Sequence, residues 1–62
     1  MIEVCRSEYA TVVASMSRDS RYSRHVLGPD TVWYDDDGGC VACCTTHSGS
    51  RFFVSKELFQ KI

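Results

Sequence analysis

The residues best suited to chemistry lie in one short segment of the chain, which contains Cys40, Cys43, Cys44 and His47. Cys40 and Cys43 form a CxxC pair, and Cys44 with His47 could form a second pair. Two close pairs of thiolate and imidazole ligands are typical of a structural zinc ion, which needs four ligands in a tetrahedron. Cys5 is a further candidate ligand near the start of the chain.

The same segment also has the composition of a buried β-strand. Side chains alternate along a strand, so Cys40, Cys44 and Thr46 would share one side while Cys43 and His47 share the other. A metal-binding CxxC normally lies on a tight turn, and the apolar residues between these two cysteines favour none. We therefore expect the cysteines to pack as small hydrophobic residues, with no metal and no cofactor. A zinc module built from Cys40, Cys43, Cys44 and His47 is the alternative, and a redox dithiol is a weaker one.

Nucleophilic catalysis requires a thiol within hydrogen-bond reach of an imidazole. Cys43 and His47 share one side of the expected strand, but four residues of strand separate them by about 13 Å. A pairing of His25 with Cys5 or Cys44 stays open. A chain of this length leaves little room for a catalytic pocket, so we expect no enzyme.

Length and charge narrow the function classes further. The chain has 62 residues, which we expect to form one domain over residues 1–62 with a marginal core. Seven basic against eight acidic residues leave a net charge of −1, which gives no overall field to attract nucleic acid or an anionic membrane. The chain has no run of about 18 apolar residues. Its start lacks the basic and apolar regions of a signal peptide, so we expect an intracellular, reducing setting with free thiols rather than disulfides.

Apolar residues at spacings of three and four predict an N-terminal helix, bent or split, that continues to Leu27. Residues Ile2–Cys5 are either part of that helix or a short strand followed by a helix that Ser7 caps. The Gly28-Pro29 pair ends the helix because glycine releases the backbone and proline cannot continue it.

Three segments rich in β-branched and aromatic residues follow, separated by turns; they are Thr31–Tyr34, Cys40–Thr46 and Arg51–Val54. Ser55 then caps a final helix over Lys56–Ile62. The predicted fold is α+β, with an N-terminal helix, a three-stranded antiparallel β-meander and a short C-terminal helix. A sheet this small needs a covering layer, which the helices supply on one face.

The predicted sheet has more large side chains than one buried face can hold. Trp33 and Tyr34 must lie on opposite faces, and Phe53 points outward if Phe52 and Val54 point inward. One aromatic residue from each outer strand is thus left for a contact patch, unless helix ends or loops cover it.

Two charged segments complete the candidate surface. Asp35, Asp36 and Asp37 form an acidic turn, which is either a solvated loop or a patch that meets basic residues on a partner. Arg18, Arg21 and Arg24 lie on the predicted helix, as a solvated face or as contacts to phosphates.

A very short, intracellular, single-domain chain with few motifs and a local acidic patch resembles the small inhibitors that phages and mobile elements encode against host defence complexes, the anti-CRISPR proteins among them. The resemblance is one of type and covers the whole chain. It implies a non-enzymatic inhibitor that binds a host protein complex stoichiometrically, at a surface where that complex handles nucleic acid. The near-neutral charge differs from that of strongly acidic DNA mimics and favours blocking by shape with local charge contacts.

The resemblance also implies a partner and a place in the cell. The partner would be a host protein complex in the bacterial cytoplasm, with no direct nucleic-acid or membrane contact, and a second copy of the chain is a further candidate. A nucleic-acid-binding regulator that uses the three arginines is an alternative of another class. The expected partner-binding residues are Asp35, Asp36, Asp37, Trp33, Tyr34 and Phe53.

Overall fold

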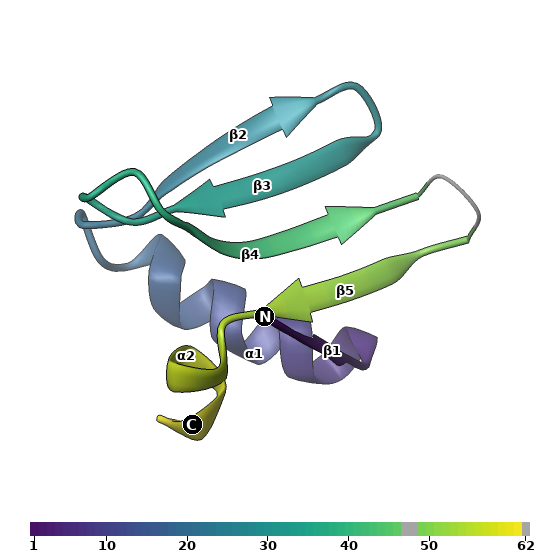
Figure 1. The fold of residues 1–62 in the computed structure, drawn as a ribbon, viewed down its shortest axis with the longest axis horizontal. Helices are drawn as coiled ribbons and strands as arrows, with labels where there is room; N and C mark the ends of the chain where they lie inside the picture. The colour runs from purple at the N-terminus through teal and green to yellow at the C-terminus, as the bar shows by residue number, and fades with distance from the viewer. Residues whose placement is uncertain (47–48, 62) are drawn as a thin grey trace.

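The computed structural model describes residues 1–46 and 49–61, which form an α+β fold with one sheet and two helices (Figure 1). The elements follow in the order β1 (Ile2–Val4), α1 (Arg6–Ser17), β2 (Ser23–Leu27), β3 (Asp30–Tyr34), β4 (Cys40–Thr45), β5 (Arg51–Val54) and α2 (Lys56–Gln60). The five strands lie in the spatial order β1-β5-β4-β3-β2, and every neighbouring pair is antiparallel. The prediction of an α+β fold is confirmed, but the sheet has five strands rather than three.

The first additional strand settles the alternatives for Ile2–Cys5. Residues Ile2–Val4 pair with β5, so this segment is a strand and not the first turn of the helix. Cys5, rather than Ser7, precedes the first helical residue, and its backbone N–H donates a hydrogen bond to Glu8 Oε1 at 2.9 Å. A glutamate at this position satisfies a backbone donor that the first helical turn leaves free.

The second additional strand overturns the prediction of a helix to Leu27. Helix α1 ends at Ser17, and residues Ser23–Leu27 form β2, which pairs with β3 across a turn at Gly28 and Pro29. Gly28 has a φ of 63°, a conformation that glycine adopts at little cost and that suits a two-residue hairpin turn. The glycine and proline therefore reverse a strand here rather than end a helix.

The later elements agree with the sequence. The predicted strand over Arg51–Val54 is confirmed, and the other two predicted strands differ from the observed ones by one residue at an end. Ser55 caps α2 as predicted, since its Oγ accepts a hydrogen bond from the Leu58 N–H at 3.2 Å. Helix α2 ends at Gln60 with Lys61 as its cap, which is earlier than the predicted end at Ile62, and Ile62 itself lies outside the described residues.

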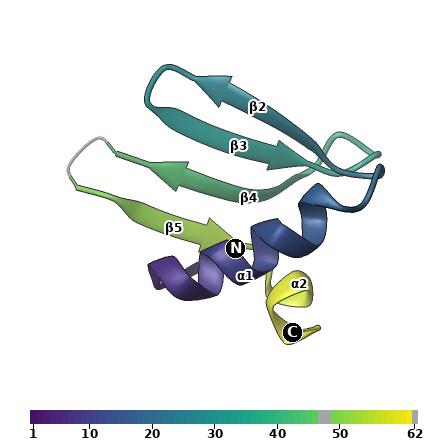
Figure 2. The same ribbon diagram turned by 180° about the vertical axis from the view of Figure 1, so that it is seen from behind.

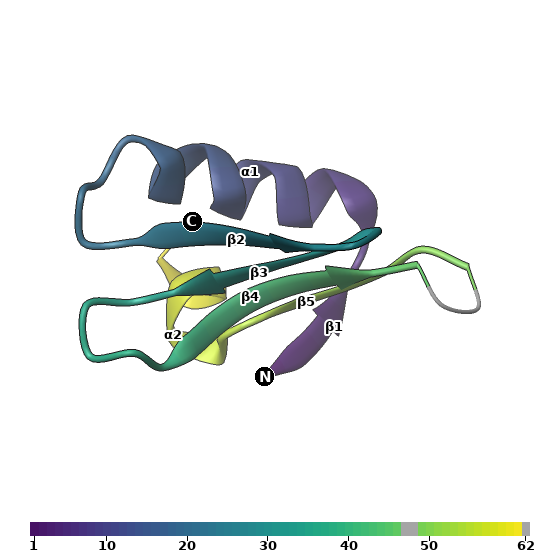
Figure 3. The same ribbon diagram turned by 90° about the horizontal axis from the view of Figure 1, so that it is seen from above.

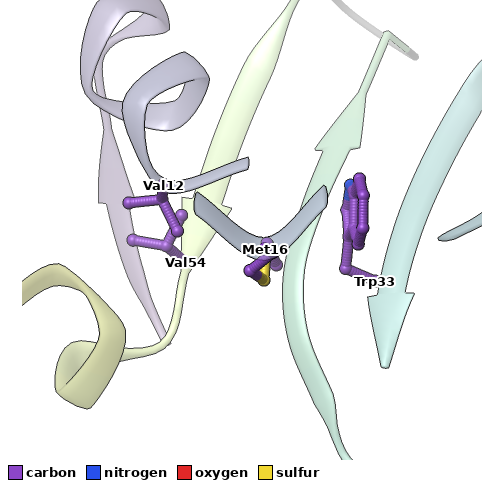
Figure 4. Packing of buried hydrophobic residues seen from close by; sticks show 5 residues of the cluster. Val12, Met16, Trp33 and Val54 are labelled. Carbon is purple, nitrogen blue, oxygen red and sulfur yellow. The ribbon is translucent and has the colours of Figure 1, made fainter. Parts of the chain in front are cut away.

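Helix α1 lies across one face of the sheet (Figure 3), and α2 lies beside α1 (Figure 2). Figure 4 shows the core between α1 and the sheet, with the Met16 side chain between Val54 and the Trp33 ring. Of the residues that the structure describes, five are buried in this core; they are Val12, Met16, Trp33, Ala42 and Val54. None of the described helices is long and apolar enough to cross a bilayer.

Candidate interaction surface

The face of the sheet opposite α1 carries a row of side chains from all five strands. The pairing register places Glu3, Phe53, Cys43, Val32 and His25 side by side on this face. Their neighbours along each strand point toward the helix. We call this surface the open face, because among the described residues no helix lies over it (Figure 3).

Aromatic rings on the open face are held by polar and aromatic neighbours. The rings of Tyr34 and His25 meet edge to face, with their centroids 5.1 Å apart. The Arg51 guanidinium lies 5.3 Å from the centroid of the Phe53 ring and forms an ion pair with Glu3 at 3.0 Å. Hydrogen bonding to Arg51 holds the pKa of Glu3 below its usual range. These contacts leave Tyr34 and Phe53 half-buried, with their outer sides free.

Trp33 lies on the other face, as its alternation with Tyr34 requires. It is 5% exposed and packs in the core, so it belongs to no surface that a partner could reach. Its indole Nε1 is buried without a hydrogen-bond partner among the described residues. Of the two aromatic residues predicted as an anchor, the structure leaves only Tyr34 at the surface.

The acidic turn divides into one structural residue and two exposed ones. Asp35 Oδ1 accepts hydrogen bonds from the backbone N–H groups of Asp37, at 3.0 Å, and Gly39, at 2.8 Å. Asp36 and Asp37 are exposed. Carboxylate oxygens of the three aspartates lie within 4.8 Å of one another. Asp35 therefore shapes the turn, whereas the other two side chains are free to contact a partner.

The cysteines are arranged differently from the predicted alternation. Cys44 faces the helix side, in the row of Thr31 and Phe52. A β-bulge between Trp33 and Tyr34 pairs Cys40 with Tyr34, which places Cys40 on the open face together with Cys43. The expectation that Cys40 shares a side with Cys44 is therefore wrong, because the extra residue of the bulge interrupts the alternation. All four cysteines are free thiols.

Burial raises the pKa of the Cys43 thiol, and the neighbouring Cys40 thiol raises it further. The predicted zinc ligands are not brought together as a set, since Cys44 lies on the opposite face. His47 lies outside the described residues. Cys5 is next to β1 and His25 is in β2, at opposite edges of the sheet, so these two residues do not form a catalytic pair.

The three arginines predicted on one helix lie outside α1, two in the connection after it and one in β2. Arg18 follows the last residue of α1, Arg21 is in the connection to β2, and Arg24 is in β2. Arg21 forms an ion pair with Asp19 at 2.7 Å, and hydrogen bonds from Arg21 lower the pKa of Asp19 to about 2. This arrangement is unlike a continuous basic face for phosphate contacts.

The sequence interpretation missed β2, the most exposed strand of the sheet. Each of its five residues is exposed, with Val26 at 63% and Leu27 at 59%. The signal in the sequence was limited to Gly28-Pro29, which puts a glycine at the first position of a two-residue turn directly before the β-branched and aromatic residues Thr31–Tyr34. Figure 1 shows β2 at the edge of the sheet, on the side away from α1 and α2.

Comparisons of this chain with protein-family models, with curated proteins and with solved structures found no match.

Proposed function

We propose that this chain is a binding protein that covers a surface of a partner protein complex stoichiometrically, through the open face and the edge strand β2. The observation that carries the proposal is the exposure of β2, where Val26 and Leu27 keep more than half of their surface in contact with water. An edge strand that exposes two large apolar side chains beside an unpaired backbone edge is suited to contact with another protein.

The backbone of β2 offers a means of attachment. Leu27 and Asp30 flank the two-residue turn, and such flanking residues bond each other in a hairpin. Bonded and non-bonded pairs alternate along antiparallel strands, so Arg24 and Val26 direct their N–H and C=O groups to the free edge. A strand of the partner can add to the sheet at this edge, with the backbone giving affinity and the side chains giving specificity.

Side chains of the open face and of the acidic turn supply the specificity. Tyr34 and Phe53 are the large rings of the open face, and Asp36 and Asp37 extend the surface beyond the end of β3. The two carboxylates favour a basic region on the partner. A basic surface of that kind serves a complex that handles nucleic acid, which agrees with the resemblance to small inhibitors of host defence complexes. The inhibitor would act by occupying that surface, without catalysis.

The test compares recovery of a partner by variants of the immobilised chain in a bacterial host lysate. The wild type should recover a protein complex at one copy per complex. Val26→Lys blocks strand addition, and Tyr34→Ala removes the ring, and each should weaken the affinity by at least about tenfold. Gln60→Ala changes an exposed residue of α2 and should bind as the wild type does.

Two results would contradict the proposal. One is equal recovery of the partner by the wild type, Val26→Lys and Tyr34→Ala, with circular dichroism confirming that each is folded. The other is a stable dimer of this chain, detected by sedimentation, that persists when the partner is present.

Titration of the purified complex should show that its activity on nucleic acid stops at one equivalent of the chain.

A further inference from the structure

Three sulfur atoms gather on the open face at the start of β4. The β-bulge places Cys40 opposite Tyr34, while Cys43 lies opposite Val32, so both thiols are on the face that α1 leaves free. The Sγ of Cys40 lies 3.9 Å from the Sδ of Met1, a residue 39 positions away in the sequence. The Cys40 thiol is also close enough to Cys43 to raise the pKa of that thiol. Regular alternation along the strand would have put Cys40 and Cys43 on opposite faces.

The ligand types limit which metal ion this cluster can hold. Zinc in a structural site needs four ligands, usually thiolate or imidazole, and a thioether is not among its usual ligands. Cys44 cannot complete such a set, because it lies in the helix-facing row with Thr31 and Phe52. Thiolate and thioether sulfurs are soft ligands of the kind that Cu(I), zinc and iron–sulfur clusters take. Iron–sulfur clusters, like structural zinc, need four ligands, which leaves monovalent copper for this set of three sulfurs.

We propose that Cys40, Cys43 and Met1 form a surface site for Cu(I). Binding replaces the two thiol protons, so that Cu⁺ and two thiols give a bis-thiolate complex of charge −1 and two released protons. The copper ion enters and leaves in the same oxidation state, and no oxidant or reductant takes part. Cys40 is exposed and Met1 is 57% exposed, so the ion can reach the sulfurs directly from solvent.

The copper site shares the open face with the proposed partner surface but does not rest on the proposed function, because it is tested on the purified chain alone. The reduced protein is titrated with Cu(I) without oxygen, in competition with a chromophoric Cu(I) chelator. One equivalent of Cu(I) should bind to a monomer, with an ultraviolet thiolate-to-copper charge-transfer band. Cys40→Ser and Cys43→Ser should each lower the affinity at least about 100-fold. Loss of a residue that only orients a metal ligand already lowers metal affinity by up to about 100-fold, and loss of the ligand itself should cost no less.

Two further variants make the assignment specific. Cys5→Ser removes an exposed thiol at the other end of β1 and should leave the affinity unchanged. Met1→Leu, made by cleaving an N-terminal fusion so that leucine is the first residue, should lower the affinity about tenfold while the charge-transfer band remains. Circular dichroism of each apo variant establishes that it is folded.

Several results would overturn the site. Retention of one tightly bound Cu(I) in Cys43→Ser would assign the copper to other residues, and failure of the wild type to compete with the chelator would remove the site altogether. Copper that binds only between two chains, detected as a copper-dependent dimer in sedimentation, would exclude a site within one chain. An unchanged affinity in Met1→Leu would remove the thioether from the proposal.

Discussion

The two ends of the sheet are held by different forces. In β4 and β5, Ala42 and Val54 have no exposed surface, because Val12 and Met16 of α1 cover them. In β2, at the other end, no residue is buried, and the strand is held by its pairing with β3 and by the turn at Gly28. A segment with few buried apolar contacts opens more easily than the core. The difference shows where the fold is stabilised and where a surface is left for a partner.

Met16→Ala should have the largest effect on stability, because it leaves a cavity beneath the fully covered end of the sheet. Met16 is 1% exposed, and deletion of such a side chain lowers the free energy of unfolding by about 2–5 kcal/mol. Val26→Ala, at 63% exposure, should change it by no more than about 0.5 kcal/mol. Urea unfolding of both variants measures the difference. Similar losses would mean that β2 is as well packed as the core.

Asp35→Ala should have the next largest effect, because it removes the acceptor that organises the β3–β4 turn. Two backbone N–H groups lose their bonds to Asp35 Oδ1, and we expect a loss of about 1–2 kcal/mol in the free energy of unfolding. Asp36→Ala changes an exposed neighbour and should stay within about 0.5 kcal/mol of the wild type. Chemical denaturation again provides the measurement. If the two variants lose equal stability, the division of the acidic turn into structural and free aspartates is incorrect.

Gly28→Ala should destabilise the exposed end of the sheet by about 1 kcal/mol, because an alanine at a φ of 63° is strained. Hydrogen exchange should show faster exchange at β2 amides, with little change in β5. Gly39→Ala is the matched control, since an added Cβ there meets the Asp35 carboxylate at an ordinary 3.4 Å. Equal acceleration of exchange in β2 and β5 would show that the two ends open as one unit.

Asp19→Asn should have the smallest effect, in the connection between α1 and β2. The pKa of Asp19 is about 2 in the folded chain, below its ordinary value of 3.8, because Arg21 bonds to the carboxylate. As the pH falls, the Asp19 carboxylate is therefore protonated in the unfolded chain before it is protonated in the folded one. The stability that the Asp19–Arg21 ion pair contributes above pH 4 is lost toward pH 2. The melting temperatures of the wild type and Asp19→Asn should differ slightly at pH 6 and converge near pH 2. A difference that is constant across this range would exclude the ion pair as its cause.

Local chemistry explains which elements could be predicted. The turn after Tyr34 has aspartates and glycines, Arg51–Val54 is β-branched and aromatic, and Ser55 is a preferred helix cap. Each of these signals acts between neighbouring residues, and each predicted element is present. The spacing around Val26 and Leu27 is compatible with a helix as well as a strand. Ser23–Leu27 forms a strand because it pairs with β3, a contact that the local spacing of apolar residues does not reveal.

The candidate surface was predictable only in part. Alternation correctly separated Trp33 from Tyr34 and Phe52 from Phe53, as the register shows. Alternation does not say which face a helix will cover, so Trp33 was placed among the surface candidates although it is in the core. The side on which Cys40 lies depends on a bulge, whose position follows from the pairing of two strands and not from either strand alone.

By itself, the sequence determined the α+β class, the turn after Tyr34, the cap of the last helix and the opposite orientation of adjacent strand residues. These features depend on backbone preferences and side-chain periodicity, which act over a few residues. Only the tertiary structure decided that Ser23–Leu27 is an edge strand, that α1 buries Trp33 and leaves Tyr34 free, and that Met1 meets Cys40. Those outcomes depend on contacts between segments far apart in the chain, which are formed when the whole sheet closes under the helix.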